Sequence, residues 1–533
     1  MTAALVRTGP PIWAGEPLAG HDPVPLPDFL LGHARDLGDK PALVDGPTGR
    51  TLSYRQLADG VERVAAGLAA RGFGRGDVLA LFSPNLPEYA LAVYGAMAAG
   101  GAVTGANPLL TAGELATQLA DSGARLLVTV PPFLETARAA AEKAGVGEVV
   151  VFGEADGATP FRDLVDHDHP ATRADVDPAR DLAALPYSSG TTGLPKGVEL
   201  THANLVANAR QTQAAVGLAA DDVVLGVAPF FHAMGGNLIL PCSLRAGATL
   251  VTMPRFDLEA FLGLIQEHRV TFTIVAPPIV LALAGHPLVD RYDLSSLRIV
   301  GCGAAPLGAE VEQRCTDRLG CVVIQGFGMT EGTCTFAIVP QEAPRHGSAG
   351  RLLGGTEARI VDPDGRDLGP GRTGELWLRG PQVMRGYRNQ PQATARTVGP
   401  DGWLRTGDLC YVDDDGYLFV VDRLKELIKY KGAQVAPAEL EQLLCAHPAV
   451  ADAAVVPRPD PEAGEVPVAY VARRAEATAE ELLAWVAERV APFKRLRDVR
   501  FVDQVPRSPT GKLLRRVLVE AERADAGSAP VAP

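Results

Sequence analysis

The most informative stretch of the sequence runs from Tyr187 to Val198 and reads YSSGTTGLPKGV. It follows the apolar residues 182–185, so it is expected to leave a buried strand as a loop. Glycines and hydroxyl residues at this density provide many N–H and O–H donors, which suit the oxygens of a phosphate chain. The stretch therefore predicts a phosphate-binding loop.

The same stretch does not fit the phosphate loop of P-loop nucleotidases. That motif needs a Lys followed directly by Ser or Thr, whose hydroxyl reaches Mg²⁺. Here Gly197 follows Lys196, and the Gly-x-x-x-x-Gly-Lys spacing is not met. A P-loop nucleotidase is therefore disfavoured.

On both sides of this loop, β-branched runs alternate with Ala- and Leu-rich amphipathic runs. Helices are expected at 54–71, 87–98 and 279–284, and strands at 78–81, 102–103, 125–130 and 271–276. This alternation predicts an α/β fold with mainly parallel sheet. Between about residues 350 and 421, short strands are separated by turns such as Asp364-Gly365 and Asp415-Gly416, which predicts an antiparallel subdomain or small barrel.

Length and a second change of pattern indicate two domains. The 533 residues exceed the ~250–300 that one hydrophobic core accommodates. A charged run, DRLKELIKYKG, begins at Asp422, and beyond it we expect helices at 438–445 and 479–489 and strands at 453–456, 468–471 and 499–501. We predict a large N-terminal domain of α/β layers (1–422) with a β-barrel-like subdomain, and a small mobile α+β C-terminal lid (423–533).

The composition of the chain disfavours several classes of binding partner. The formal net charge of −13 repels nucleic acid and anionic lipid surfaces. The charge-free residues 90–110 are interrupted by Gly, Asn and Pro, so we expect a buried helix and strand there and no stable membrane insertion. The seven cysteines form no CxxC pair, and residues 1–13 have no long apolar run, which together favour a cytoplasmic protein.

Further motifs follow in a characteristic order. They are Gly303-Ala304-Ala305-Pro306, Gln325-Gly326-Phe327-Gly328-Met329-Thr330-Glu331, Thr406-Gly407-Asp408, the run from Asp422 to Lys429, and Pro509-Thr510-Gly511-Lys512. With SSGTTGLPKGV, they resemble the adenylate-forming superfamily of acyl- and aryl-CoA ligases, luciferase-like enzymes and peptide-synthetase adenylation domains. LKELIKYKG followed by QVAPAELE is most similar to 4-coumarate:CoA ligase-like bacterial acyl-CoA ligases.

The resemblance implies an AMP-forming acid–thiol ligase. An acid and ATP would give acyl-AMP and pyrophosphate, and acyl-AMP and coenzyme A would then give acyl-CoA and AMP. The implied cofactors are ATP, Mg²⁺ and coenzyme A as co-substrate. A carboxylate is a poor electrophile until its oxygen becomes a good leaving group, and transfer to AMP achieves this.

The resemblance also assigns the nucleotide site. The β- and γ-phosphates would be held by Ser188, Ser189, Gly190, Thr191, Thr192, Gly193 and Lys196. The adenine would be framed by Gly303, Ala304, Ala305, Gln325, Gly326 and Phe327, where Phe327 replaces the usual Tyr. Thr330 would contact the α-phosphate region, Glu331 would bind Mg²⁺, and Asp408 would chelate the ribose hydroxyls beside Arg423.

For the reacting groups, Lys512 resembles the lysine that bridges the carboxylate and the α-phosphate, with Lys429 and Gln434 as partners in the same closed state. A rotation of the lid about a hinge at Lys425 would then bring Lys431 and Gly432 to the thiol tunnel. Arg255 is a further candidate for coenzyme A. The basic residues Arg489, Lys494, Arg495, Arg497 and Arg500 could meet its phosphates or form a solvated face.

The acyl pocket is expected around His232, Ala233, Met234, Gly235, Gly326, Gly332 and Thr333. A lone His among apolar residues is commonly a core residue, but the resemblance places His232 in the pocket as a catalytic residue that positions the acyl group. Met234 stands where the hydroxycinnamate ligases have Tyr, and the paired Gly235 and Gly236 are expected to leave apolar room. A bulky hydrophobic or aromatic acid is therefore expected, either cinnamate-like, fatty or terpenoid.

Other functions remain open at this point. They are a luciferase-like oxygenase, an adenylation enzyme that loads a carrier protein in trans or performs one half-reaction, and a non-catalytic nucleotide or acyl-binding protein. The expected partners are a small carboxylic acid, ATP and coenzyme A, and the chain is expected to be a monomer or homodimer.

Overall fold

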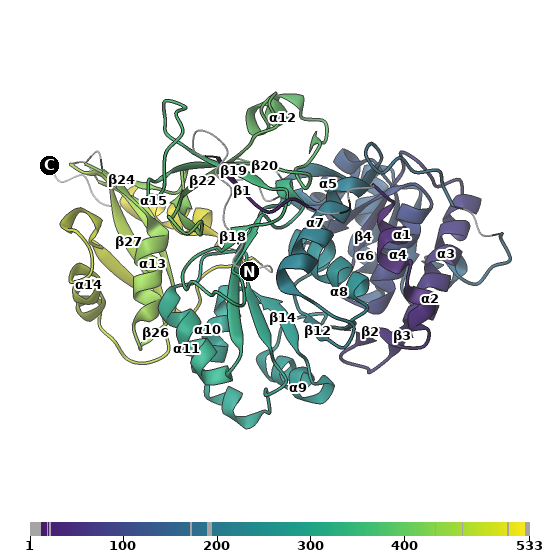
Figure 1. Ribbon diagram of the computed structural model, residues 1–533, viewed down its shortest axis with the longest axis horizontal. Coiled ribbons are helices and arrows are strands. Elements are labelled where there is room, and N and C mark those ends of the chain that lie inside the picture. The colour runs from purple at the N-terminus through teal and green to yellow at the C-terminus, as the bar shows by residue number, and fades with distance from the viewer. Residues whose placement is uncertain are drawn as a thin grey trace.

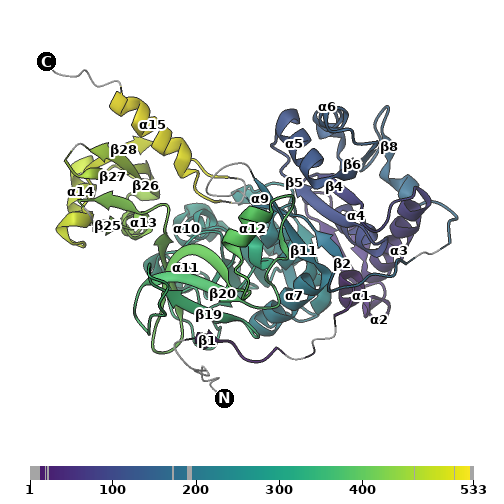
Figure 2. The same cartoon turned by 90° about the horizontal axis from the view of Figure 1, so that it is seen from above.

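The computed structural model describes residues 12–18, 20, 23–170, 173–188, 195–431, 433–460, 462–508 and 511–527. A large N-terminal domain and a small C-terminal domain lie side by side in two views of the chain (Figures 1 and 2). Within the described ranges, no helix is both long enough and apolar enough to cross a bilayer.

Three sheets build the large domain. In spatial order, the first contains β10 (Tyr187–Ser188), β11 (Lys196–Thr201), β9 (Leu182–Ala184), β5 (Ala102–Ala106), β4 (Val78–Phe82), β6 (Ala124–Thr129), β7 (Glu148–Val151) and β8 (Thr159–Pro160), with β21 (Gly386–Tyr387) against β11. The second, in the same manner, contains β18 (Arg351–Leu352), β17 (Ala337–Ile338), β16 (Val322–Phe327), β15 (Ile299–Cys302), β14 (Phe272–Val275), β12 (Val223–Gly226), β13 (Thr249–Thr252), β2 (Pro41–Asp45) and β3 (Thr51–Ser53). The third contains β1 (Ile12–Ala14), β19 (Glu357–Val361), β20 (Gly374–Arg379), β22 (Leu404–Val412) and β23 (Leu418–Arg423).

Strand β4 explains why helices cover both faces of the first sheet. Its side chains alternate between faces, as the two-residue period of a strand requires. Leu79 and Leu81 join the core between the first two sheets, whereas Ala80 and Phe82 pack on the opposite side. Because both sets of side chains are buried, the sequence of the strand is a continuous run of apolar residues.

The helices fall into three layers around these two sheets. The inner layer is α1 (Leu26–Leu31), α2 (Ala34–Leu37), α3 (Tyr54–Ala70), α4 (Pro87–Ala98), α7 (His202–Val216) and α8 (Leu240–Ala246). One outer layer is α5 (Ala112–Ser122) and α6 (Leu134–Ala144), and the other is α9 (Leu258–His268), α10 (Pro277–Gly285) and α11 (Ala309–Leu319). The short α12 (Pro391–Thr397) lies beside the third sheet (Figure 1).

The expected parallel α/β organisation is confirmed. Strands β4, β5, β6 and β7 pair in parallel, as do β12, β13, β14, β15 and β16. The charge-free residues 90–110 do form most of the buried α4 and then β5. Helix α3 begins one residue after Ser53, whose side chain accepts the N–H of Gln56 in a capping box.

The prediction of a barrel-like subdomain was wrong. The third sheet is antiparallel throughout, as predicted, but it is open, with β1 and β23 at its two edges. Strand β1 comes from the start of the chain and pairs with β19, a long-range contact that the local pattern did not reveal.

The small domain has one sheet, ordered β25 (Ala433–Val435), β24 (Ile428–Tyr430), β27 (Gly464–Arg473) and β26 (Val450–Asp460), with β28 (Asp498–Val502) against β27. Helices α13 (Pro437–Ala446), α14 (Ala479–Ala487) and α15 (Arg515–Gly527) accompany it. Strand β23 ends at Arg423 and β24 begins at Ile428. The boundary between residues 422 and 423, the mobility of the lid and the hinge at Lys425 stay predictions.

Candidate active site

The carboxyl edge of the second sheet brings several predicted segments together. Strands β12, β14, β15 and β16 are neighbours and run parallel. The chain leaves β12 towards His232, leaves β15 at Gly303 and leaves β16 towards Glu331. Ligands of open α/β sheets bind outside the carboxyl ends of the strands, so this edge is the candidate site.

The predicted phosphate loop joins the two strands of a hairpin. Tyr187 pairs with Gly197 and Ser188 pairs with Lys196, so the ends of the loop are held in register. The hydroxyl of Ser188 is buried and has no hydrogen-bond partner among the described residues. A buried donor without a partner is uncommon and needs an explanation, which a bound phosphate oxygen would provide.

Five residues predicted for this loop lie outside the described residues. They are Ser189, Gly190, Thr191, Thr192 and Gly193. Their assignment to the phosphates stays a prediction.

Tyr387 connects the end of the loop to the predicted metal-binding carboxylate. The Nζ of Lys196 lies 4.8 Å from the centre of the Tyr387 ring, and the Tyr387 hydroxyl donates to Glu331 Oε1 at 2.8 Å. Burial, followed by the charge of Glu331, raises the pKa of Tyr387 well above its ordinary value, so the hydroxyl remains a donor. Sequence reasoning did not identify Tyr387, which follows a Gly in strand β21 and matches none of the quoted motifs.

Asp408 and Arg423 are cross-strand partners in β22 and β23. The Arg423 Nε lies 3.3 Å from Asp408 Oδ1, and the Asp408 side chain is buried. Burial raises the pKa of Asp408 to about 6, while the charges of Arg423 and Lys512 act in the opposite direction. The carboxylate is thus mostly ionised at neutral pH, and the charges of Arg423 and Lys512 favour its ionised form.

Lys512 reaches this group from the small domain. Burial lowers the pKa of Lys512, and Arg423 lowers it further, whereas Glu426, Glu331 and Asp408 raise it. Lys512 therefore lies near enough to these groups, which belong to different segments of the chain, for their charges to act on it. The structure therefore brings together Lys512, Glu331 and Asp408, as their predicted roles require.

The loop that carries Lys512 is closed on itself. Ser508 N–H donates to the Lys512 carbonyl at 2.8 Å, and Lys512 N–H donates to the Ser508 hydroxyl at 3.1 Å. Gly511 has a φ of +80°, a conformation that favours glycine. The turn is anchored by Arg507, whose guanidinium donates to both carboxylate oxygens of Asp452 at 2.8 Å.

His232 lies close enough to Lys512 to sense its charge. Burial and then the charge of Lys512 lower the pKa of His232 to about 4, so the ring is neutral at pH 7. Its Nδ1 accepts the N–H of Met234 at 3.3 Å, which leaves the proton of the neutral ring on Nε2. The ring can therefore orient a group through an N–H donor, as expected for a positioning residue.

The loop after β15 is held in place by the side chain of Gln325. Ala304 has a φ of +73°, which is unusual for a residue with a Cβ. The Gln325 side chain accepts the Leu307 N–H at 2.8 Å, and its amide donates to the Leu307 carbonyl at 3.0 Å and to Glu312 at 2.7 Å. The side chain of Gln325 therefore supports the loop, so any contact of this residue with adenine must come from its backbone.

Phe327 also packs in a hydrophobic core. The residue is 9% exposed and its ring belongs to the core beneath the third sheet, together with Trp13 and Phe336. Gly326 lies in β16 opposite Ile338 of β17, and a Cβ at Gly326 would lie 3.1 Å from the Ala337 carbonyl oxygen. Only the small exposed part of the Phe327 ring can meet a nucleotide, and the adenine roles of Gly303, Ala305 and Gly326 stay predictions.

The paired glycines after His232 do not open the acyl pocket, which corrects the expected apolar room. A Cβ at Gly235 would overlap the Pro229 carbonyl, and a Cβ at Gly236 would overlap the Phe230 carbonyl. Both glycines instead allow residues 233–239, which form a π-helix, to pack against the preceding backbone. Ala233 and Met234 are buried on this segment, and the Met234 Cε would lie 3.0 Å from a Cβ at Gly303.

Two other residues predicted for the acyl pocket, Gly332 and Thr333, make packing and hydrogen-bond contacts within the protein. A Cβ at Gly332 would overlap the ring of Phe336. Thr333 has a φ of +66°, its hydroxyl donates to the Gln382 carbonyl at 2.8 Å, and its own carbonyl accepts the amide of Asn237 at 2.9 Å. The Thr333 side chain therefore points into the protein and its hydroxyl is not offered to a ligand.

Most of the remaining predicted residues are exposed in this arrangement. Lys429 and Gln434 form an exposed cross-strand pair in the β24–β25 hairpin. Lys425, Lys431 and Arg255 are exposed as well, and Gly432 lies outside the described residues. Thr330 is half-buried at the start of the turn that carries Glu331. The roles of these residues stay predictions.

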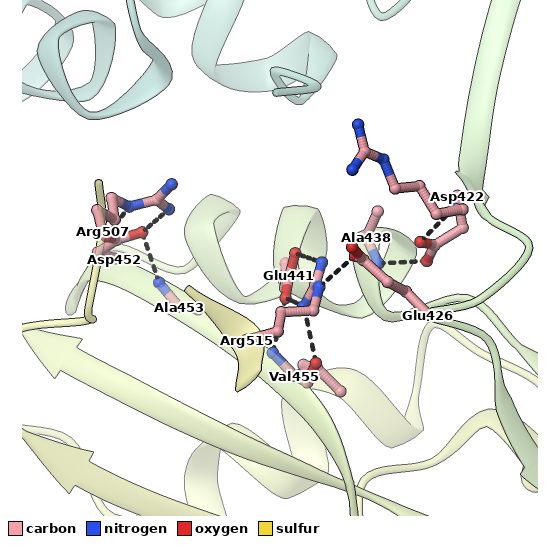
Figure 3. A network of polar contacts seen from close by, with 10 residues as sticks. Asp422, Glu426, Ala438, Glu441, Asp452, Ala453, Val455, Arg507 and Arg515 are labelled. Carbon is pink, nitrogen blue, oxygen red and sulfur yellow. Dashed lines mark hydrogen bonds and ion pairs between the residues drawn. The ribbon is translucent and has the colours of Figure 1, made fainter. Parts of the chain in front are cut away.

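A polar network that the sequence did not reveal ties the end of β23 to the small domain (Figure 3). The buried Asp422 accepts the Ala438 N–H at the start of α13 at 3.0 Å. Arg515 contacts both oxygens of Glu441 and donates to Glu426 at 2.6 Å. Burial raises the pKa of Asp422 to about 6, against the charge of Arg515.

Comparisons with known proteins agree with this geometry. Residues 32–388 match the family model "AMP-binding enzyme", and residues 439–512 match "AMP-binding enzyme C-terminal domain". The chain is 45% identical to 4-coumarate–CoA ligase 5 of Oryza sativa subsp. japonica, over 93% of this chain and 94% of that protein. It is 42% identical to 4-coumarate–CoA ligase of Pinus taeda, over 93% of this chain and 95% of that protein.

A solved structure extends the likeness to three dimensions. The anthranilate CoA ligase AuaEII, in complex with anthranoyl-AMP, superposes with a TM-score of 0.88 and 27% identity, covering 95% of this chain and 98% of that one. The matches span both domains and include the segments that carry Glu331 and Lys512. The chain therefore belongs to the AMP-binding family of adenylate-forming enzymes.

Proposed function

We propose that the protein joins a carboxylic acid to the thiol of coenzyme A through an acyl-adenylate. In the first step a carboxylate oxygen attacks the α-phosphorus of ATP, and pyrophosphate leaves. In the second step the thiol sulfur attacks the acyl carbonyl carbon, AMP leaves, and the thiol proton is released. The family match and the 4-coumarate–CoA ligase relatives support this AMP-forming acid–thiol ligase activity.

One observation carries the mechanism, and it is the position of Lys512. The charges of Arg423, Glu426, Glu331 and Asp408 all act on its ammonium group, which supports a place for Lys512 near the carboxyl edge of the sheet. When two anions approach, a preorganised cation offsets their repulsion and stabilises the charge that develops. Lys512 would act there on the carboxylate and the α-phosphate, while Lys196 and the Ser188 hydroxyl would hold the phosphates beyond.

Glu331 fits the role of the magnesium ligand. Mg²⁺ is commonly bound by one or two carboxylates together with substrate phosphates. The Tyr387 hydroxyl bond occupies only part of the acceptor capacity of the Glu331 carboxylate. In the part of the chain that the structure describes, no cluster of three His, Cys, Asp or Glu forms an all-protein metal site. Bound at Glu331, Mg²⁺ would neutralise phosphate charge.

The substrate that fits best is an aromatic acid of the cinnamate type without a polar ring substituent. Residues 233–239 offer Asn237 as their one polar side chain, and its amide is used by the Thr333 carbonyl. Met234 presents an apolar thioether beside Gly303. Residues 233–239 thus offer no free donor for a ring hydroxyl, so they give 4-coumarate no advantage over cinnamate.

The test uses two half-reactions and a matched control. Acid-dependent ATP–pyrophosphate exchange reports adenylation, and thioester formation from synthetic acyl-AMP and coenzyme A reports the second step. Lys512→Ala is expected to lower exchange by about 10²–10³-fold and to leave the second step nearly unchanged. Lys143→Ala, at an exposed position in α6, serves as the control. Exchange that survives in Lys512→Ala would contradict the mechanism.

The acid is identified with a panel of cinnamate, 4-coumarate, medium-chain fatty acids and polycyclic terpenoid acids. We expect the highest kcat/KM with cinnamate. A clear preference for 4-coumarate would refute the argument from Met234, and a preference for fatty or terpenoid acids would mean a larger pocket. Exchange without thioester would indicate an acceptor other than free coenzyme A.

A further inference from the structure

Helix α10 is the surface of the large domain on which the small domain rests. It lies next to α11, and both are close to α13 of the small domain in the two views (Figures 1 and 2). At its start, the Ala276 side chain touches Gly511 so closely that a Cβ on Gly511 would overlap it. Lys512 is the next residue, so this contact sets how far Lys512 enters the site.

The other end of α10 receives an arginine of the small domain. Arg474 follows β27, and its Nε donates to the Val450 carbonyl at 2.8 Å, which fixes the guanidinium group. A Cβ at Gly285, the last residue of α10, would lie 2.6 Å from Arg474 Nη1. Nearby, Gln442 of α13 packs against Gly308, with 3.6 Å from its Cβ to a Cβ built on Gly308. Glycines thus form the shallow surface that receives the small domain.

A second cation lies beside Arg474 in this contact. Arg314 of α11 lies close enough for its charge to lower the pKa of Arg474, after the larger effect of burial. The Nε and Nη2 of Arg314 are buried and have no hydrogen-bond partner among the described residues. A carboxylate neighbour on the same helix, Glu310, lies 4.0 Å from the other terminal nitrogen. Two like charges therefore act on each other across the domain contact, and their repulsion opposes the association of the domains.

We propose that Gly285, Arg474 and Arg314 are positioning residues that set the balance between the two half-reactions. The close contact of Arg474 with Gly285 lets the small domain dock so that Lys512 reaches the acid and ATP. The repulsion between Arg474 and Arg314 keeps that docking weak, so the small domain can leave for the second step. The proposal rests on the proposed function and on the predicted rotation of the small domain between its two steps.

Two substitutions in the large domain have opposite expected effects. Arg314→Glu replaces repulsion by attraction to Arg474, so thioester formation from synthetic acyl-AMP should slow by about three- to tenfold while exchange is unchanged. Gly285→Leu obstructs Arg474, so exchange should fall by about tenfold or more while thioester formation stays within about twofold. Arg35→Glu, a charge reversal at a 73%-exposed position on α2, is the matched control.

The measurements are single-turnover rates of each step, with thermal unfolding to verify that each variant is folded. The double variant Gly285→Leu/Arg474→Ala should recover part of the lost exchange, because the obstructed guanidinium is removed. The inference is overturned if Arg314→Glu leaves both steps unchanged or slows both alike, or if Gly285→Leu slows both alike. A wild-type protein without acid-dependent exchange would instead refute the proposed function.

Discussion

Asp408→Asn should make the nucleotide-free protein more stable and its nucleotide site weaker. The pKa of Asp408 rises from 3.8 to about 6 because the carboxyl group is buried. This is a shift of roughly two units, and each unit corresponds to about 1.4 kcal/mol, so keeping the carboxylate ionised costs the fold about 3 kcal/mol at neutral pH. The amide of the variant is neutral and avoids that cost.

The pH dependence gives the sharper test. Because the folded-state pKa is raised, the stability contributed by the neutral carboxyl is complete below pH 4 and is lost as the pH rises through about 6. The advantage of Asp408→Asn should therefore be greatest near pH 8, as an increase of a few degrees in Tm. It should vanish towards pH 4, where the wild-type carboxyl is itself neutral.

Thermal unfolding without nucleotide measures the first effect, and calorimetric titration with ATP measures the second. Loss of a charged acceptor should weaken nucleotide binding by about 10- to 100-fold. Asp414→Asn, in the exposed turn after β22, is the control and should change neither quantity. A lower Tm for Asp408→Asn at pH 8, or a Tm difference that does not vary with pH, would refute the reasoning.

Three further substitutions probe other parts of the site. His232→Gln should slow adenylation without changing the shape of its pH–rate profile between about pH 5.5 and 8, because a ring with a pKa of about 4 stays neutral there. A lost ionisation near 6.5 would contradict this. Tyr387→Phe should raise the Mg²⁺ concentration needed for half-maximal rate by about five- to tenfold, because the Glu331 carboxylate loses the hydrogen bond that the Tyr387 hydroxyl donates at 2.8 Å. Gly332→Ala should lower the stability by about 1–3 kcal/mol, because its Cβ overlaps Phe336, whereas Gly147→Ala, with open space around it, should leave Tm unchanged.

The sequence predicted the parts of the fold that depend on local pattern. Helix 87–98 matches α4, and the parallel strands follow from continuous apolar runs. The motifs around Glu331, Asp408 and Lys512 were expected to form one site, and in the structure the charges of Glu331 and Asp408 both act on Lys512, while their roles stay predictions.

Contacts between distant segments could not be predicted in this way. Tyr387 meets Glu331 across 56 residues, and Asp422 meets Ala438 from the other side of the domain boundary. Gln325 was expected to frame the adenine, yet its side-chain amide and carbonyl bind the backbone of Leu307 in the loop after β15. A single sequence shows which residue types are present, but not which hydrogen bonds they have already made.

The glycines that pack against backbone near His232 limit how the enzyme can acquire new substrates. Gly235, Gly236 and Gly332 leave no space for a Cβ, so each is closed to directed evolution unless the surrounding chain moves. A mutational library spread evenly over this region would consist largely of misfolded members. Diversity is better placed at Ala233 and Met234, which carry side chains on the same segment.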